Sequence, residues 1–458
     1  MTTATTDLVV ELPSAIAAGA LGFSAEASAA IGDLTEEPTW AREERAASWL
    51  LHERLGLPTS RDEHWRFTKL RGFRLDALAP YTAAPSELAA TERAQDDVVI
   101  ATGSSAAHMT VVDGDETSML LESLPAGVLV LPLADAMRDH EELVRRHLGS
   151  AVRAGDSIDD TFVALAEAMW STGVFVYVPR GVKVEQPIRA DLLHATAGGS
   201  VTWRALIVLE ELAEATFVEE FASIDGAAGG FSNAIVELVA GAGSQLKYLT
   251  TQNWAAPVAH FATHRLLAHR DARVEWTAVG LGASMGKTRM EVRMVGAGSS
   301  VHLNGIYFLD GSQNLDYDTQ QFHEAPNAMS DLAFRGVLAG KANSVWRGMI
   351  DVAKDAQGTD SYQENRNLLL SSNTHADSIP GLQIEANEVR CTHAATTSKL
   401  DAEQLFYLMA RGLTRAESTK QIARGFYIPV LDRVSDETIR EGIQEALFVR
   451  LEAALSAV

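Results

Sequence analysis

Four short segments in the middle of the chain share one pattern: ATFVE (215–219), SQLKY (244–248), ARVEW (272–276) and SSVHL (299–303). Each follows a turn and places a small residue before polar and apolar residues that alternate, with a departure at Val218 in the first segment. One apolar position recurs in all four after 29, 28 and 27 residues: Phe217, Leu246, Val274 and Val301. Short strands at this nearly constant spacing predict a β-solenoid, in which each coil buries its apolar face against its neighbours.

The surrounding sequence extends this mainly β region. From Gly173 onward apolar residues alternate with period 2, and residues 200–350 contain many glycine-rich turns but almost no helical periodicity. A large meandering β-sandwich would produce similar strands, although equal spacing would then be accidental. The solenoid is the favoured interpretation, and the sandwich stays as the alternative fold.

Helices are expected at both ends of the chain, because apolar residues recur there at helical spacing. Between the first helices, Trp65 and Phe67 are two residues apart, which suggests a short strand against a core. The helical segments expected are residues 15–30, 39–55, 134–147, 159–170, 401–411, 414–425 and 436–455. Short strands are expected at residues 98–101, 109–112 and 127–131. We therefore predict three regions: a mainly helical region with short strands (1–150), a β-helix core (151–395) and a C-terminal helical module (396–458).

The composition argues against nucleic-acid and membrane binding. The 458 residues include 61 acidic and 38 basic residues, a net charge of −23, whereas nucleic-acid and anionic-membrane surfaces need clustered lysine and arginine. No apolar run approaches the roughly 20 residues that span a bilayer, and the N-terminal sequence does not resemble a secretory signal. A single cysteine cannot form an internal disulfide, so we expect a cytoplasmic protein.

Two motif-like stretches fit strands better than binding sites. Residues 280–288 (GLGASMGKT) resemble a phosphate-binding loop, but Leu281 stands where the first glycine is needed and the following residues alternate like a strand. His260 and His264 have the spacing of a zinc pair on a helix. In a strand these two histidines lie about 13 Å apart, too far to share one metal ion.

Two polar stretches closer to the C-terminus are further candidates for a functional site. His323 and Glu324 could serve as a ligand and a base, but such a pair is more typical of a polar ladder or a turn. Residues 344–373 combine polar side chains with an apolar run at 368–370, which predicts hydrogen-bond ladders between coils rather than an acid/base pair. The polar residues of this stretch are Arg347, Lys354, Asp360, Gln363, Asn365, Arg366 and Asn367.

The best candidate for chemistry is the pair Cys391 and His393, which includes the only cysteine of the chain. Side chains two residues apart on an extended strand point to the same side. A lone cysteine is usually a small buried hydrophobe, but the polar neighbours suggest an exposed thiol, and Arg390 and His393 could lower its pKa. Thiolate and imidazole both bind iron or zinc, yet two ligands do not complete a tetrahedral site, so a second chain would have to supply the rest.

Several long blocks resemble the SufB/SufD family of scaffold proteins for iron–sulfur cluster assembly. The resemblance covers most of the chain from about residue 40, in the same order as in the family. The blocks are RDEHWRFTKL (61–70), residues 159–188, residues 348–413 and the helical tail. RDE-x-W-R-F-T resembles SufD more than SufB, whereas ATTSK (395–399) and PVL (429–431) are closer to SufB, and SufD is favoured. Ala394 departs from a glycine common in the family, which affects the local turn but removes no ligand.

The resemblance implies a right-handed parallel β-helix with helical flanks, acting as a non-catalytic scaffold. It implies a heterodimer with a SufB-like paralogue through the β-helix and a SufC-like ATPase at the C-terminal helices, so this chain itself needs no nucleotide. Cys391 and His393 would then lie at the SufB interface as candidate ligands of iron or a transient iron–sulfur cluster. The candidate ATPase-docking residues are Leu405, Phe406, Tyr407 and Leu408.

Two other functions remain open on the sequence. A β-helix polysaccharide lyase or hydrolase would need paired carboxylates in a cleft, and Asp316 and Asp318 are the nearest such pair. A purely structural homodimer would pair the β-helix edge with a second copy and bind no metal. Co-purification with an ATPase would separate the scaffold from the lyase.

Overall fold

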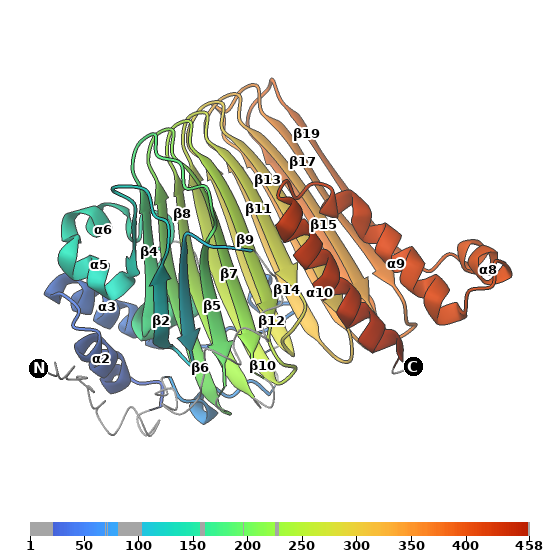
Figure 1. The fold of residues 1–458 in the computed structure, drawn as a ribbon, viewed down its shortest axis with the longest axis horizontal. Coiled ribbons are helices and arrows are strands. Elements are labelled where there is room, and N and C mark those ends of the chain that lie inside the picture. The colour runs from blue at the N-terminus through green and yellow to red at the C-terminus, as the bar shows by residue number, and fades with distance from the viewer. Residues whose placement is uncertain are drawn as a thin grey trace, which may run out of the picture.

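The computed structural model describes residues 22–68, 70, 72–80, 103–155, 161–195, 197–224 and 229–456, and a parallel β-solenoid of two sheets dominates it (Figure 1). From edge to edge, the ten-stranded sheet contains β19 (Arg390–Lys399), β17 (Asp360–Leu369), β15 (Met329–Leu338), β13 (Ser300–Leu309), β11 (Arg273–Gly280), β9 (Gln245–Asn253), β7 (Glu214–Ser223), β5 (Ile188–His194), β1 (Ala107–Val112) and β2 (Asp115–Leu121). The nine-stranded sheet contains β18 (His375–Ile384), β16 (Asn343–Val352), β14 (Asn314–His323), β12 (Met285–Met294), β10 (Val258–Ala268), β8 (Gly230–Ala240), β6 (Gly199–Leu209), β4 (Thr172–Val178) and β3 (Leu129–Pro132).

Each coil of the solenoid takes one strand from each sheet. From β4 onward consecutive strands alternate between the sheets, and each strand from β4 to β17 pairs in parallel with the strand two places further along the chain. Eight coils result, from β4–β5 to β18–β19. The predicted solenoid is therefore confirmed, and a meandering sandwich is excluded because its sequential strands would pair antiparallel.

The register of the repeats corrects one step of the sequence alignment. Val274 pairs with Leu246 and with Val301, as predicted. Phe217, however, pairs with Tyr248, so the first segment was aligned two residues out of register. A shift of two residues keeps every side chain on the same face of a strand, so the apolar pattern alone could not detect it.

Helices at the N-terminal side cover the outer face of the nine-stranded sheet (Figure 1). Helix α3 packs on α7, and α7 packs on β6 and β8, while α5 packs on β4. The helical elements of this side are α2 (Ala25–Leu34), α3 (Thr39–Leu55), the 3₁₀ turns η1 (Glu63–Trp65) and η2 (Leu75–Ala77), α5 (Leu133–Asp139), α6 (Glu141–His147) and α7 (Thr161–Met169). The strand predicted at 98–101, and the part of the predicted helix 15–30 before residue 22, lie outside the described residues.

The strand predicted at Trp65 and Phe67 is wrong. Trp65 ends a 3₁₀ turn in which its N–H donates to the Asp62 carbonyl at 2.9 Å. The Trp65 ring packs against Phe162 and Phe261, with ring centroids 5.1 and 5.5 Å apart. The turn thus fastens the N-terminal segment to α7 and β10, and burial of the indole ring needs no strand.

The interior of the solenoid is closed at its N-terminal end. Strand β2 pairs antiparallel with β1, and β3 pairs antiparallel with β4, so neither sheet continues in parallel beyond these strands. The same segment contributes buried apolar side chains to the interior core: Ala106, Ala107, Met109, Val111, Val128 and Val130. These residues fill the space that a further coil would occupy.

The C-terminal helices α8 (Ala402–Ala410), α9 (Arg415–Leu431) and α10 (Glu437–Ser456) follow the last strand. Helices α9 and α10 pack on the outer face of β13, and α9 also packs on β15. Tyr427 donates to the Tyr307 carbonyl at 2.7 Å, and Arg433 donates to Asn304 at 2.6 Å. Helix α8 contacts α9 and projects away from the solenoid (Figure 1). Among the described residues, none of the helices combines the length and the apolar character needed to cross a bilayer.

Candidate functional site

The last coil of the solenoid, β18 and β19, is uncovered on its C-terminal side. Within the described part of the chain each of these strands pairs on one side only, with β16 and β17 respectively. All their residues are exposed or half-buried, whereas the strands before them are mostly buried. An unpaired strand edge offers its backbone N–H and C=O groups to another strand. We call this surface the open end.

Core-type side chains line the open end. Residues on β18 that are in register with the buried positions of β16 occupy the interior side of the strand. They are Ala376, Ser378, Pro380, Leu382 and Ile384. Leu382 and Ile384 are 38% and 40% exposed, although their register partners Ile350 and Val352 are fully buried. An apolar surface of this kind is typical of an interface with another chain.

Cys391 and His393 lie on the same interior side of the open end. Cys391 is in register with Ser361 and His393 with Gln363, and both partners are buried inside the preceding coil. Cys391 is half-buried and packs against the cluster around Ile350, whereas His393 is exposed. Their Cα atoms are two strand positions apart, about 7 Å. A sulfur and a nitrogen donor therefore face the space beyond the last coil.

The pKa of Cys391 is raised, not lowered as the sequence suggested. The main cause is burial, and the carboxylate of Asp360 adds to it. Arg390 is adjacent to Cys391 in sequence, so strand alternation places it on the other side, where it pairs with Asp360 at 3.4 Å. The thiol is therefore protonated at neutral pH, and binding a metal ion would have to displace its proton.

The polar stretch 344–373 forms ladders only where its residues face inward. Gln363 donates to the carbonyls of Gly348 and Gly381 at 3.3 and 3.1 Å, which joins neighbouring coils. Asn367 donates to Asn365 at 2.7 Å and to Ser378 at 3.3 Å. These contacts confirm the predicted ladders and support the coil that carries Cys391 and His393.

The other polar residues of this stretch lie on the outer face, where they make no ladder inside the solenoid. Arg347 binds the Glu63 carbonyl and His64 of the N-terminal segment. Arg366 donates to Glu364 on its own strand, Asp360 pairs with Arg390, and Lys354 lies exposed in a turn. The period-2 alternation of a strand explains this division, since residues 363, 365 and 367 face inward.

The other candidate histidines serve the core. His260 and His264 are buried on β10, and burial lowers the pKa of each to about 3. Both histidines lie on a strand, as predicted, and each is bonded within the core: His260 with Ser232 at 3.0 Å and His264 with Tyr248 at 2.8 Å. His323 is buried at the end of β14 and bonds with Ser330 at 2.9 Å.

The two remaining motif candidates also have structural roles. Lys287, in the loop-like stretch 280–288, lies on strand β12, so this segment forms the predicted strand and does not begin a helix. Asp316 accepts from Lys287 at 2.8 Å and Asp318 bonds with His64 at 2.8 Å. Both aspartates are buried under the N-terminal segment, and the hollow that Asp318 lines has a volume of only about 30 Å³, too small for a sugar substrate of a lyase.

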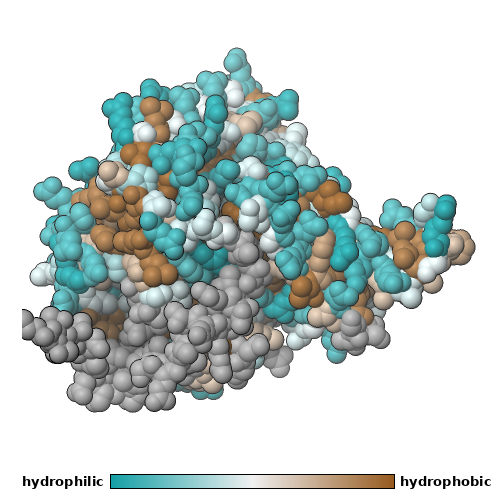
Figure 2. All heavy atoms as spheres, in the orientation of Figure 1, coloured by the Kyte–Doolittle hydropathy of each residue, from teal (hydrophilic) through white to brown (hydrophobic). Residues whose placement is uncertain are grey.

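Helix α8 presents an apolar surface beside the open end of the solenoid. Phe406 and Tyr407 are 73% and 58% exposed, Leu408 is half-buried, and Leu405 is the buried residue of the helix. A hollow of about 470 Å³ between α8 and α9 includes Tyr407 and Leu408. Figure 2 shows brown, apolar side chains on this projecting part of the molecule.

Two donors alone do not make a complete metal site. Among the residues that the structure describes, no group of three or more His, Cys, Asp or Glu side chains could hold a metal ion. A thiol and an imidazole are ligand types that iron and iron–sulfur clusters accept, and a tetrahedral site built on Cys391 and His393 would need two ligands more than the described residues around them supply. The apolar side chains of β18 near Cys391 and His393 have no local sequence signal. They are exposed because β18 and β19 form the last coil, and the sequence of β18 itself does not reveal this.

Comparison with known proteins gives a consistent result along the chain. The family described as "SUF system FeS cluster assembly, SufBD core domain" matches residues 192–426, and "SufBD protein N-terminal region" matches residues 34–190. An iron–sulfur cluster assembly SufBD family protein of Staphylococcus epidermidis is 30% identical over 303 residues, which are 66% of this chain and 64% of the relative. Proteins of the same description from Staphylococcus haemolyticus and Staphylococcus aureus are 30% and 29% identical over the same shares. The chain thus spans just under two thirds of the length of these relatives.

Proposed function

Because the chain belongs to the SufBD family of iron–sulfur cluster assembly proteins, we propose that it is a cytoplasmic, non-catalytic scaffold subunit of a SUF assembly complex. The observation that carries the proposal is the open end, where a thiol and an imidazole lie inside an uncovered coil surface. The cluster is the cargo of this site and not a resident cofactor. The resemblance of residues 61–70 to SufD favours a SufD-like role.

A SufB-like paralogue is the proposed occupant of the open end. A second solenoid that ends in the same way could pair its edge strands with β18 and β19 and cover Leu382 and Ile384. Such an interface would bury the apolar side chains and satisfy the free backbone groups in one step. It would also place the ligands of the partner opposite Cys391 and His393.

The shared site would hold iron or a nascent cluster between the two chains. His393 is exposed at the open end, so it is the first ligand in this proposal. Cys391 is half-buried, with a raised pKa, and would join when iron displaces its proton. Thiolates of the SufB-like chain would complete the coordination.

A SufC-like ATPase is the proposed partner of the C-terminal helices. Phe406 and Tyr407 supply exposed aromatic area of the kind that anchors protein interfaces, whereas buried Leu405 holds α8 in place. Helix α9 is fastened to β13 by the bond from Tyr427 to Tyr307. Movement of the ATPase would therefore reach the solenoid, and we propose that it opens the interface at β19.

The test is reconstitution of the complex with its SufB-like and SufC-like partners without oxygen, followed by iron and sulfide analysis. The variant His393→Ala should lose at least half of the bound iron and sulfide while the three chains still co-purify. His375→Ala is the matched control, because His375 is an exposed histidine of the same last coil that faces outward beside Asp377. Equal iron and sulfide in wild type and His393→Ala would remove the ligand role.

The isolated chain provides a second check. A homodimer of this chain through the open end, with no metal, is the competing function for the same surface. Light scattering should give a monomer at micromolar concentration, and addition of the SufB-like chain should give a heterodimer. A stable homodimer that excludes the SufB-like chain would favour the structural alternative.

A further inference from the structure

Helix α9 lies across the outer face of β13 and β15, and its Tyr427 is fully buried there (Figure 1). The Tyr427 hydroxyl donates to the main-chain carbonyl of Tyr307 on β13 at 2.7 Å. Because this hydroxyl is sealed from water, α9 cannot shift at Tyr427 without leaving a buried polar group unpaired or pulling β13 with it. The hydrogen bond is therefore a firm connection between α9 and one residue of the ten-stranded sheet.

The side chain of the same residue, Tyr307, points into the solenoid and reaches past the neighbouring strand. Tyr307 is in register with Gly336 on β15, and Gly336 is in register with Asn367 on β17. The tyrosine ring fills the space beside Gly336, where a Cβ atom would lie 1.9 Å from Tyr307 Cε2. The hydroxyl thus crosses β15 and donates to Asn367 Oδ1. A glycine at position 336 is what lets a side chain of β13 bond with β17.

The hydrogen bonds continue from Asn367 to the last coil. Asn365 donates to the Tyr307 hydroxyl at 3.3 Å, and Asn367 donates to Asn365 at 2.7 Å. Ser378, on β18 of the opposite sheet, donates to Asn365 at 2.6 Å and accepts from Asn367 at 3.3 Å. We call these four residues, Tyr307, Asn365, Asn367 and Ser378, the tyrosine network. It leads from the residue that α9 holds to a strand of the open end.

The members of the tyrosine network are placed to move together. Tyr307, Asn365 and Asn367 are at most 1% exposed, and Ser378 is half-buried. A protein interior is packed about as densely as an organic crystal, so a displaced side chain moves its neighbours and does not enter a void. A buried amide or hydroxyl that loses its partner has no water to replace it, which is unfavourable. The contacts of the network are therefore kept or lost as a group.

We propose that Tyr307 is a positioning residue that couples the C-terminal helices to the last coil of the solenoid. Movement of α9 shifts Tyr307 through its carbonyl, and the Tyr307 hydroxyl shifts the rest of the network. Asn365 is in register with Ala395 on β19, two residues from His393. The coupling is reciprocal, so a partner that covers the open end also biases the position of α9. The inference rests on the proposed function only where it takes the SufC-like ATPase as the partner that moves α9.

The test uses the isolated full chain and measures hydrogen–deuterium exchange of backbone amides in peptides from β18 and β19. Tyr427→Phe removes only the hydroxyl on α9 and should speed exchange in these peptides about fivefold, the effect of one lost hydrogen bond. In a Tyr307→Phe background the same substitution should change exchange less than about twofold, because the connection is already broken. Two results would overturn the proposal: no change at β18 and β19 in Tyr427→Phe, or the same fivefold change in both backgrounds.

Tyr317→Phe is the matched control for the Tyr307→Phe background. Tyr317 is also buried inside the solenoid, and its ring stacks on Tyr307 with the centroids 5.4 Å apart, but it is not a member of the tyrosine network. In the Tyr317→Phe background, Tyr427→Phe should keep its fivefold effect. Loss of the effect there would mean that any loosening of the core breaks the connection, which contradicts a specific role of Tyr307.

Ser378→Ala tests the far end of the network and serves if Tyr307→Phe does not fold. Ser378 is half-buried, so its substitution disturbs the core less than a change at a fully buried position. In this background Tyr427→Phe should again change exchange at β18 and β19 less than about twofold. An undiminished fivefold effect would show that the connection does not pass through Ser378 and would overturn the proposal. Circular dichroism spectra equal to wild type confirm that each variant is folded.

Addition of the SufC-like ATPase separates this inference from the proposed function. The bound ATPase should change exchange at β18 and β19 in the wild type, and less than half as much in Tyr307→Phe, although the two chains co-purify equally. An equal response in Tyr307→Phe would contradict the positioning role. An ATPase that does not bind would remove the proposed partner, whereas the experiments on the isolated chain would still decide the coupling.

Discussion

The two ends of the solenoid consist of the same coil but finish in different ways. At the N-terminal end β2 and β3 turn antiparallel, and side chains such as Met109 and Val128 fill the interior. At the C-terminal end β18 and β19 stay parallel to the coil before them, and Leu382 and Ile384 remain exposed. The geometry of the coils therefore does not by itself close the end of a solenoid. Closure needs a reversed strand and a separate set of apolar side chains, and the described residues provide neither at the C-terminal end.

The difference supports the proposal that the open end is the interface. A repeat protein that keeps one end open must have that end covered by something else, because unpaired strands promote aggregation. The position of Cys391 and His393 on the uncovered coil agrees with this reasoning. Three experiments separate the two ends, from the largest expected effect to the smallest.

The largest expected effect is a difference in the free energy of unfolding between alanine variants of two leucines on the interior side of the solenoid. Leu332 on β15 is fully buried, so Leu332→Ala should lower the free energy of unfolding by about 2–5 kcal/mol. Leu382→Ala, on the interior side of β18, should cost less than about 1 kcal/mol in the isolated chain, because the leucine is already partly in water. Urea denaturation of both variants checks this, and equal losses would mean that the open end is covered in solution.

The next effect concerns partner binding. If the proposed SufB-like chain covers the open end, Ile384→Asp should weaken their association about 1,000-fold, roughly 4 kcal/mol, because the interface would bury an unpaired carboxylate. Leu120→Asp on β2 is the matched control, since Leu120 is a similarly exposed residue of the closed end and should have no effect. Titration of each variant with the SufB-like chain measures the difference. Similar weakening by both variants would place the interface elsewhere.

The smallest expected effect is on the pH dependence of the free energy of unfolding. It comes from polar side chains inside the solenoid, which differ between the N-terminal and the C-terminal half. Near the open end the interior uses uncharged amides, whereas the closed half buries Glu219, whose pKa burial raises to about 7 from 4.5 despite hydrogen bonds from Tyr248 and Trp203. The folded state therefore binds the proton more tightly than the unfolded state. This contribution, on the order of 3 kcal/mol, is present below pH 4.5 and is lost as the pH rises through about 7.

Glu219→Gln measures that contribution directly, because glutamine cannot titrate. The wild type should lose stability relative to Glu219→Gln between pH 4.5 and 7, and the difference should then stay constant. Free energies of unfolding at a series of pH values give the comparison. A difference that does not change with pH would show that Glu219 titrates alike in the folded and unfolded states.

The repeat predicted most of the fold because strand alternation and spacing are local properties of the sequence. The placement of Cys391 and His393 on one side of a strand could also be predicted, since residues two apart share a side. The register of Phe217 could not be predicted, because a shift of two residues leaves the apolar pattern unchanged. The pKa of Cys391 depends on burial and on Asp360, which belongs to the neighbouring strand.

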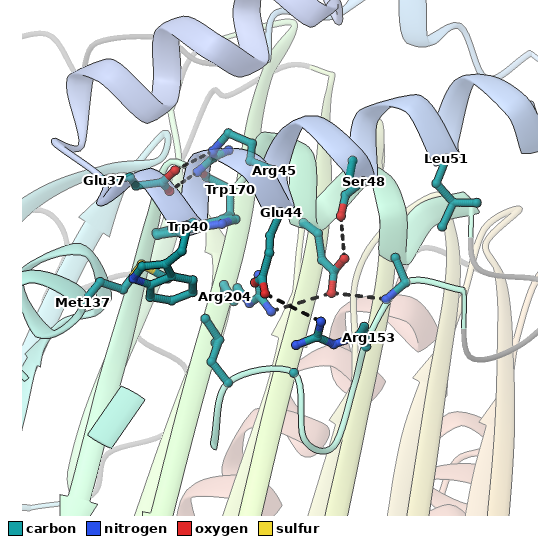
Figure 3. Close-up of a pocket in the computed structure, with 16 residues that line it drawn as sticks. Glu37, Trp40, Glu44, Arg45, Ser48, Leu51, Met137, Arg153, Trp170 and Arg204 are labelled. Carbon is teal, nitrogen blue, oxygen red and sulfur yellow. Dashed lines mark hydrogen bonds and ion pairs between the residues drawn. The ribbon is translucent and has the colours of Figure 1, made fainter. Parts of the chain in front are cut away.

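Other features depend on distant parts of the chain and left no local signal. A pocket of about 160 Å³ takes Trp40 from α3, Glu167 from α7 and Arg204 from β6, with more than 30 residues between each (Figure 3). Leu405 is buried because α8 packs on α9. The sequence alone therefore could not separate this buried residue from its neighbours at 406–408. Contacts across the fold decide both features.

The closed end of the solenoid is also the end that the ribosome makes first. Each coil pairs with the coil before it, so a finished N-terminal end gives every later coil a template as it emerges during translation. The last coil, with Cys391 and His393, is then the final part of both sheets to be added. The order of synthesis would thus delay exposure of Cys391 and His393 until the rest of the solenoid has formed, which shortens the time during which the Cys391 thiol of an unfinished solenoid meets oxidants.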